Sequence, residues 1–543
     1  MSHDHDHNHR CMQSDFVFST IYGDEEAQKT ILWLQALREA MPLPALDAEH
    51  RFSAGDLFLM ANPTDFLGSA PTALAGLRQF AERWLKGWVS GLHLLPFYPA
   101  EENDPHATQD FRRVRSEVGN WSDILALGGQ FHLMTDLPLQ RTARAHHWFQ
   151  AFCQGEPDFE AYYLGQENPT LNYLNPQILR EMSAALLHTV YRGARLARLV
   201  DVERLWYRDG SLKLNDTRCH LAARFLRSVV NECAPGFRLM AGVSSDQGDT
   251  ALYGGNGENE AHLLPNNAFA PLLLHALWNG DTAPFRTWAK RMSLPFPEVM
   301  FYNQIDTLES FAVQPAARVL SAEQRRSLGR QAEARGGQVT WQSGADGQPD
   351  ALELRLRLWD ALRAADGETE DTGIARYLAA HAVLFSLVGL PALSLSSLLA
   401  PALPARISGE GRIAVSQTVD LNAVENQMAQ ENSPLRRVYD GLRQLAAARA
   451  AVPAFDPAGV QTILDAGEGV FGVLRFSLFE AGLVVCLTNF TNQTCGACAD
   501  INEEGFEVSA WRDVLSDQTF SNAQARQLSL QPYQSLWLVP VEA

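Results

Sequence analysis

Short apolar runs alternate with amphipathic helical patterns along most of this chain, and this rhythm limits the possible folds more than any other feature. The stretches between the runs, such as 72–89 and 216–233, carry apolar residues at three- and four-residue spacing, as amphipathic helices require. Near-continuous apolar strands separated by helices indicate buried parallel strands. About eight such units predict an α/β fold with a closed (β/α)8 TIM barrel rather than an open sheet. The predicted strands are 56-DLFLMANP, 91-GLHLLPFYP, 131-FHLMTDLPL, 196-LARLVDV, 237-FRLMAGV, 299-VMFYNQID, 389-GLPALSLS and a weaker one near 260-EAHLL.

Other parts of the chain break this rhythm and predict additional domains. A length of 543 residues is too great for one hydrophobic core. A segment rich in His, Trp, Tyr and Asn predicts a loop-rich insertion after the third strand, and short β-like runs near the C-terminus predict an antiparallel β-sandwich. The predicted organisation is a His-rich disordered tail (1–15), the first part of the barrel (16–140), the insertion (141–190), the rest of the barrel (191–452) and the C-terminal β-sandwich domain (453–543).

Charge and hydropathy exclude several classes of partner. The formal net charge of −19 disfavours nucleic acid and anionic membranes, because both surfaces are negatively charged. No segment approaches eighteen uninterrupted apolar residues, and the N-terminus lacks the apolar core of a signal peptide. Seven cysteines in so long a chain do not form a disulfide framework. These observations predict a cytoplasmic protein with neither a nucleic-acid nor a membrane partner.

Two sequence features resemble metal or redox sites. In 1-MSHDHDHNHR-10 histidines alternate with acidic or amide residues, which is compatible with a divalent metal, although a solvated tail is the preferred interpretation. Cys495 and Cys498 form a single CxxC in a predicted β-turn, without a helix to lower the thiol pKa and without a second CxxC for zinc. We therefore predict no metal site and no cofactor. The two cysteines are interpreted as part of a hairpin loop, with oxidation as the alternative.

Functional side chains of a (β/α)8 barrel come from the C-terminal ends of its strands. The candidates are therefore the polar residues in the later part of each predicted strand or shortly after it. They are Asp104, Asp110 and Asp136 after strands two and three, Arg198 and Asp201 at strand four, and Asp306 or Glu309 at strand seven. The fifth strand offers only Gly242, Ser244 and Ser245.

Several motifs occur in one order from about residue 50 to the end of the chain. They are 92-LHLLPFYP, 110-DFRRV, 119-GNWSDI, 131-FHLMTDL, 147-HWFQAFCQGEP, 198-RLVDVERLW, 253-YGGNGENEAH, 271-PLLLHAL, 389-GLPALSLSSLL and 469-GVFGVLRF. In this order the chain resembles the sucrose phosphorylase and glucosylglycerate phosphorylase branch of the α-amylase superfamily, glycoside hydrolase family 13. The resemblance implies a retaining double displacement. In that reaction a strand-four carboxylate forms a covalent glucosyl-enzyme, and a strand-five glutamic acid protonates the leaving oxygen.

The chain departs from the family pattern at both chemical positions. Arg198-Leu199-Val200 matches the family's Arg-x-Asp, with valine in place of the nucleophile. Counting back from Tyr253 places the general acid at Gly242. Valine cannot attack an anomeric carbon and glycine cannot donate a proton, so neither step of the family reaction is available.

Positions that bind the sugar in the family are partly kept. The resemblance implies substrate-binding roles for Asp104, Asp136, Arg198 and Asp306. Arg141 stands where the family has a sugar-binding histidine, and Thr418 stands about where it has a sugar- or phosphate-binding arginine.

Asp201 and Asp306 are weak catalytic candidates, and no intact catalytic set is predicted. Asp201 directly follows Val200, so only a bulge would turn it into the barrel, because successive strand side chains alternate faces. The alternative is a structural carboxylate that pairs with Arg204 or Arg208, or that caps the next turn.

Two functions of different class remain. The first is a non-catalytic, glucoside-binding or regulatory pseudoenzyme, and the motif substitutions favour it. The second is an active glucosyltransferase or glycoside phosphorylase that acts on a sucrose-like α-glucoside with displaced carboxylates. Both imply a small sugar or glucoside as the ligand. A homodimer, or a heteromer with a catalytic relative, is compatible with either.

Overall fold

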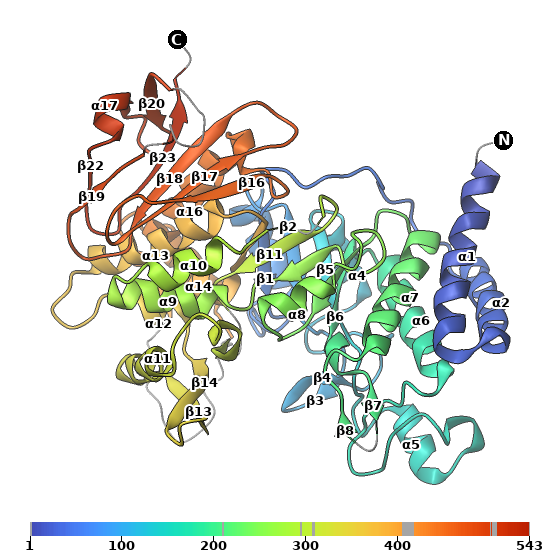
Figure 1. Cartoon of the computed structure of the whole chain (residues 1–543). Coiled ribbons are helices and arrows are strands. Elements are labelled where there is room, and N and C mark those ends of the chain that lie inside the picture. The colour runs from blue at the N-terminus through green and yellow to red at the C-terminus, as the bar shows by residue number, and fades with distance from the viewer. Residues whose placement is uncertain are drawn as a thin grey trace.

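The structure is a computed structural model that describes residues 3–208, 211–293, 296–306, 310–403, 418–499, 501 and 508–541. Its centre is a closed barrel of eight parallel strands (Figure 1). In order around the barrel these are β1 (Phe58–Ala61), β2 (Gly91–Leu94), β5 (His132–Pro138), β6 (Leu196–Val200), β9 (Arg238–Gly242), β10 (Leu263–Pro265), β11 (Met300–Gln304) and β15 (Leu390–Ser394). Seven of the predicted strands each contain one of them, and the weaker run 260-EAHLL overlaps β10, so the TIM-barrel prediction is confirmed.

Alternate residues of the strands fill the inside of the barrel. A separate buried cluster joins side chains from seven of the eight strands, and Phe52, which precedes β1, packs against it. The strand residues of this cluster are Phe58, Met134, Leu196, Met240, Leu263, Met300, Tyr302, Leu390 and Ala392. Because this layer fills the inside of the barrel, we expect a ligand to bind at the side where the strands end.

Amphipathic helices surround the barrel, and short polar residues begin several of them. Thr72 precedes α3, and its hydroxyl accepts a hydrogen bond from the Ala75 amide; Asn120 forms a capping box at α4. The principal helices are α3 (Ala73–Phe80), α4 (Trp121–Gly128), α6 (Pro176–Tyr191), α7 (Thr217–Cys233), α9 (Phe269–Asn279), α13 (Glu370–Ser386) and α16 (Pro434–Ala450).

Two helices precede the barrel and pack on its outside, beside α6 and α7 (Figure 1). They are α1 (His3–Tyr22) and α2 (Asp24–Ala40). The sequence predicts a disordered tail over residues 1–15, whereas the backbone is helical from His3 onward. Apolar residues later in α1 dock the helix: Phe18 is buried, and its ring lies 4.7 Å from that of Phe225 on α7.

The predicted insertion follows β5, as expected. It contains the short helices α5 (His147–Gln154) and η2 (Pro157–Phe159). The stretch predicted as insertion, 141–190, also includes most of α6, which belongs to the ring of helices around the barrel. Pro176 at the first position of α6 and Asn175 as its N-cap mark where the irregular segment ends.

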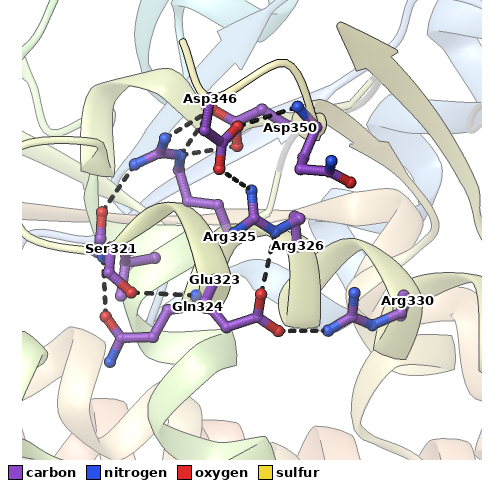
Figure 2. A network of polar contacts seen from close by, with 10 residues as sticks. Ser321, Glu323, Gln324, Arg325, Arg326, Arg330, Asp346 and Asp350 are labelled. Atoms are coloured by element: carbon purple, nitrogen blue, oxygen red, sulfur yellow. Dashed lines mark hydrogen bonds and ion pairs between the residues drawn. The ribbon is translucent and has the colours of Figure 1, made fainter. Parts of the chain in front are cut away.

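A second insertion, between β11 and α13, was not predicted. It comprises β12 (Phe311–Ala312), α11 (Ala322–Ala334), β13 (Gln338–Ser343) and β14 (Pro349–Arg355), and the three strands form an antiparallel sheet. Polar contacts join α11 to this sheet (Figure 2). The central one is the ion pair of Arg325 with Asp350, both largely buried, at a nitrogen–oxygen distance of 2.6 Å.

The C-terminal part is antiparallel, as predicted. A six-stranded sheet has the order β16 (Val460–Leu464), β17 (Val470–Phe476), β18 (Leu483–Asn489), β23 (Ser535–Pro540), β20 (Ala510–Asp513) and β21 (Thr519–Ser521). A second, two-stranded sheet pairs β19 (Cys495–Ala497) with β22 (Leu528–Leu530). Apolar side chains of the two sheets pack together in one buried cluster, separate from the core of the barrel. We propose residues 453–543 as the extent of the C-terminal β-sandwich domain.

Candidate functional site

Strand β6 determines which side chains reach the barrel mouth. Leu196 lies in the apolar cluster inside the barrel, and Arg198 bonds to Asp136 of the neighbouring strand, whereas Leu199 packs with the core outside. Because strand side chains alternate, Val200 belongs to the inward set with Leu196 and Arg198. This alternation agrees with the prediction that Val200 points into the barrel, and the assignment of a catalytic position to it stays a prediction.

Val200 and Gly242 are register partners at the ends of the adjacent strands β6 and β9. The two positions at which the sequence analysis predicts the nucleophile and the general acid are thus neighbours, and a valine and a glycine occupy them. Gly242 also lies against the backbone of β6. A β-carbon added to Gly242 would sit 2.4 Å from the Leu199 carbonyl oxygen and 2.8 Å from the Val200 Cα. No side chain fits at position 242 without a backbone shift.

Asp136 is the centre of a buried polar cluster on the floor of the mouth. Arg198 donates from Nε to one carboxylate oxygen at 2.8 Å and from Nη2 to the other at 2.5 Å. His93 of β2 lies 2.8 Å from the first oxygen, and His106 lies 3.8 Å from the second. Burial raises the pKa of Asp136, but Arg198 and His93 outweigh it and hold this pKa well below its usual range. The carboxylate is therefore ionised at neutral pH.

Two tyrosines complete this floor. Tyr302 of β11 places its hydroxyl 3.4 Å from Nδ1 of His93. Tyr98, four residues past β2, is 1% exposed, and its hydroxyl has no hydrogen-bond partner among the residues that the structure describes. Burial raises the pKa of both hydroxyls, so both are neutral donors. A buried hydroxyl without a partner is costly unless a ligand or water satisfies it.

Asp65 is a candidate that the sequence reasoning missed. It follows β1, and its carboxyl group is buried. One oxygen accepts a hydrogen bond from the Asn62 amide at 2.9 Å, and the other has no partner in the described part of the chain. Burial raises the pKa of Asp65 to about 7. The sequence did carry a signal for Asp65, because it is an acidic residue shortly after the first predicted strand. Asp104 and Asp136 were selected for their places near the ends of other predicted strands.

Asp201, the weak catalytic candidate, leaves the strand in a left-handed turn with a φ of 59°. It occupies the N-cap position of the short 3-10 helix η3 (Val202–Arg204), but its side chain makes no capping hydrogen bond. Its carboxylate lies 3.8 Å from Nε of Arg204, and its side chain is 31% exposed.

The other predicted candidates lie in different surroundings. Asp104, on β4 (Asp104–Thr108), forms an ion pair with Arg141 at 2.6 Å, so two predicted mouth residues bind each other. Asp306 is buried directly after β11. Thr418 is exposed. Glu309, the alternative to Asp306, lies outside the described residues.

The remaining predictions concern metals and thiols. Within the described residues, no group of three or more His, Cys, Asp or Glu side chains is arranged to hold a metal ion. The side chains of residues 3–12 are outside the description, so the histidine-rich stretch is not tested. Cys495 and Cys498 are free thiols, and Cys495 contacts the Thr491 hydroxyl at 3.2 Å. No helix in the described ranges is long and apolar enough to cross a membrane.

Comparison with known proteins agrees with this geometry. No protein-family model matches the chain. Glucosylglycerate phosphorylase from Spirochaeta thermophila is 27% identical, over 96% of this chain and 98% of that protein. The same enzyme from Allomeiothermus silvanus is 28% identical, over 91% and 93%. The solved sucrose 6F-phosphate phosphorylase of Thermoanaerobacter thermosaccharolyticum has a TM-score of 0.66 at 16% identity, over 84% of this chain and 98% of that one.

The barrel and these matches agree with the resemblance to the α-amylase superfamily that the sequence predicts. Along nearly its whole length the chain is similar to glucosylglycerate phosphorylases, which agrees with the predicted branch.

Proposed function

We propose that this chain is a non-catalytic relative of the glycoside phosphorylases that binds a glucoside or a related small sugar at the barrel mouth. The observation that carries the proposal is the pairing of Val200 with Gly242 at the ends of β6 and β9. The family reaction requires two carboxyl groups about 5–5.5 Å apart at these positions. A valine and a glycine with no space for a side chain supply neither group.

The polar floor supports a retained ligand site. Asp136 and Arg198 form a rigid pair of acceptor and donor groups, which suits a hydroxyl-rich ligand. Tyr98 and Asp65 each hold a buried polar atom without a partner among the described residues. These atoms supply specific hydrogen-bonding positions for a sugar.

A second candidate function is an active glycoside phosphorylase that uses displaced carboxylates. The names of the full-length relatives favour it, since both are phosphorylases. The buried carboxyl of Asp306, at the end of β11, is the group to test. Asp201 is a weaker choice, because it leaves the strand in a left-handed turn.

Thermal unfolding with sugars tests the binding proposal. Glucosylglycerate, sucrose and methyl α-glucoside at millimolar concentration are expected to raise the melting temperature, because each binds only the folded state. Tyr98→Phe is the matched variant. It removes a hydroxyl that has no partner in the described residues, so the ligand-free melting temperature stays the same while sugar affinity falls about tenfold. The proposal is wrong if no sugar shifts the parent protein.

A further inference from the structure

Glu203 is a buried carboxylate that the proposed function does not use. It lies on η3, the turn after β6, and is 1% exposed. One oxygen accepts a hydrogen bond from the Ser244 amide at 2.8 Å, and the other accepts one from the Ser245 hydroxyl. Both serines follow β9, the strand that ends at Gly242. The side chain therefore joins the segment after one barrel strand to the segment after the next.

Further polar contacts support the hydrogen bonds between Glu203 and the two serines. Asn215 donates from its side-chain nitrogen to the Ser245 hydroxyl at 3.3 Å, and its backbone amide donates to the Glu203 carbonyl oxygen at 3.0 Å. Tyr253 donates to the Asn215 side-chain oxygen at 3.1 Å. Because each partner is itself hydrogen-bonded, Glu203 and the Ser244–Ser245 segment belong to one connected polar network.

Gly242 is two residues before Ser244. The hydrogen bonds of Glu203 to Ser244 and Ser245, called the tether below, therefore restrain the backbone near Gly242. The space for a β-carbon at Gly242 is filled by the carbonyl of Leu199 and the Cα of Val200. These are backbone atoms of β6, so they cannot turn aside as the end of a flexible side chain can. A tether from β6 to the residues after β9 is suited to maintain this close approach.

We infer that Glu203 is a positioning residue that draws the segment after β9 against β6 and thereby closes the space that a side chain at position 242 needs. The inference goes beyond the proposed function, since it concerns the backbone and not the ligand. It also means that Val200→Asp with Gly242→Glu does not rebuild a catalytic pair while Glu203 is present.

A double-mutant cycle tests the coupling on the full chain. Gly242→Ala is expected to lower the melting temperature at least twice as much in the parent protein as in the Glu203→Ala variant. Without the tether, the segment after β9 moves to admit the methyl group. Gly248→Ala is the matched control, six residues further along in the first turn of helix α8 (Gln247–Leu252), because its added β-carbon would meet only side-chain ends at 3.3 and 3.4 Å. Its effect should be the same in both backgrounds. Equal costs of Gly242→Ala in the two backgrounds overturn the inference.

Hydrogen exchange gives a second readout that needs no variant at position 242. In Glu203→Ala the Ser244 amide loses its acceptor, so peptides covering 243–246 should exchange at least tenfold faster, while those covering β2 stay unchanged. Unchanged exchange at 243–246 contradicts the inference even if every Gly242 variant fails to fold. Neither measurement uses a sugar, so failure here is distinct from failure of the proposed function.

Discussion

Asp136 and Arg198 face each other as register partners on β5 and β6, and the guanidinium holds both oxygens of the carboxylate. This two-point contact fixes the orientation of both groups before any ligand arrives. The floor of the barrel mouth is therefore preorganised for binding, although the positions above it lack reactive groups.

Replacement of Arg198 by methionine should destabilise the protein by about 3 kcal/mol or more, because it leaves the fully buried Asp136 carboxylate without its main counter-charge. Chemical denaturation at pH 7 measures this loss. Asp136→Asn combined with Arg198→Met is the control, since it removes the uncompensated charge. The double variant should be more stable than Arg198→Met alone, and the reverse order would contradict the account.

The same pair predicts acid sensitivity. The folded-state pKa of Asp136 is depressed, so the stabilisation is present above the unfolded pKa of about 4 and is lost as the pH falls below it. The parent protein should lose stability steeply below pH 4. In Arg198→Met the loss of unfolding free energy below pH 4 should be smaller than in the parent protein. An equal loss in both proteins would show that the Asp136–Arg198 pair does not cause the acid sensitivity.

Asp65 predicts a pH dependence of opposite sign. Its folded-state pKa is raised to about 7, so burial of the ionised form destabilises the protein fully above pH 7, and stability rises as the pH falls from 7 to 4. Asp65→Asn should raise the free energy of unfolding at pH 8 by up to about 4 kcal/mol, with no gain near pH 4. Asp366→Asn, at an exposed carboxylate, should show no such trend. A gain from Asp65→Asn that is independent of pH would refute the assignment.

The barrel was predictable because its strands are buried on both sides and therefore read as apolar runs. Asp136 and Arg198 were predictable as candidates because each is a charged residue within an otherwise apolar run. The role of Glu203 was not, since its partners Ser244 and Ser245 come from another strand and no local pattern connects them. The sheet of β12–β14 was missed because β13 is largely solvent-accessible and its apolar alternation is limited to Val339 and Trp341, which is too short to stand out as a buried strand.

The network of Figure 2 predicts a local effect within the second insertion. Arg325→Met leaves the buried Asp350 carboxylate uncompensated, so residues 320–355 should become more sensitive to limited proteolysis while the barrel stays intact. Arg330→Ala on the same helix removes only an exposed pair with Glu323 and should have no measurable effect. Equal protease sensitivity in both variants would show that the buried pair does not hold this insertion.

The central claim is that the chain keeps a sugar site without the family chemistry. Release of glucose 1-phosphate from glucosylglycerate or sucrose with phosphate tests it most directly, with an active glucosylglycerate phosphorylase as the positive control. We predict no release above background from the parent protein. Release that Asp201→Asn or Asp306→Asn abolishes would contradict the claim and identify the displaced carboxylate.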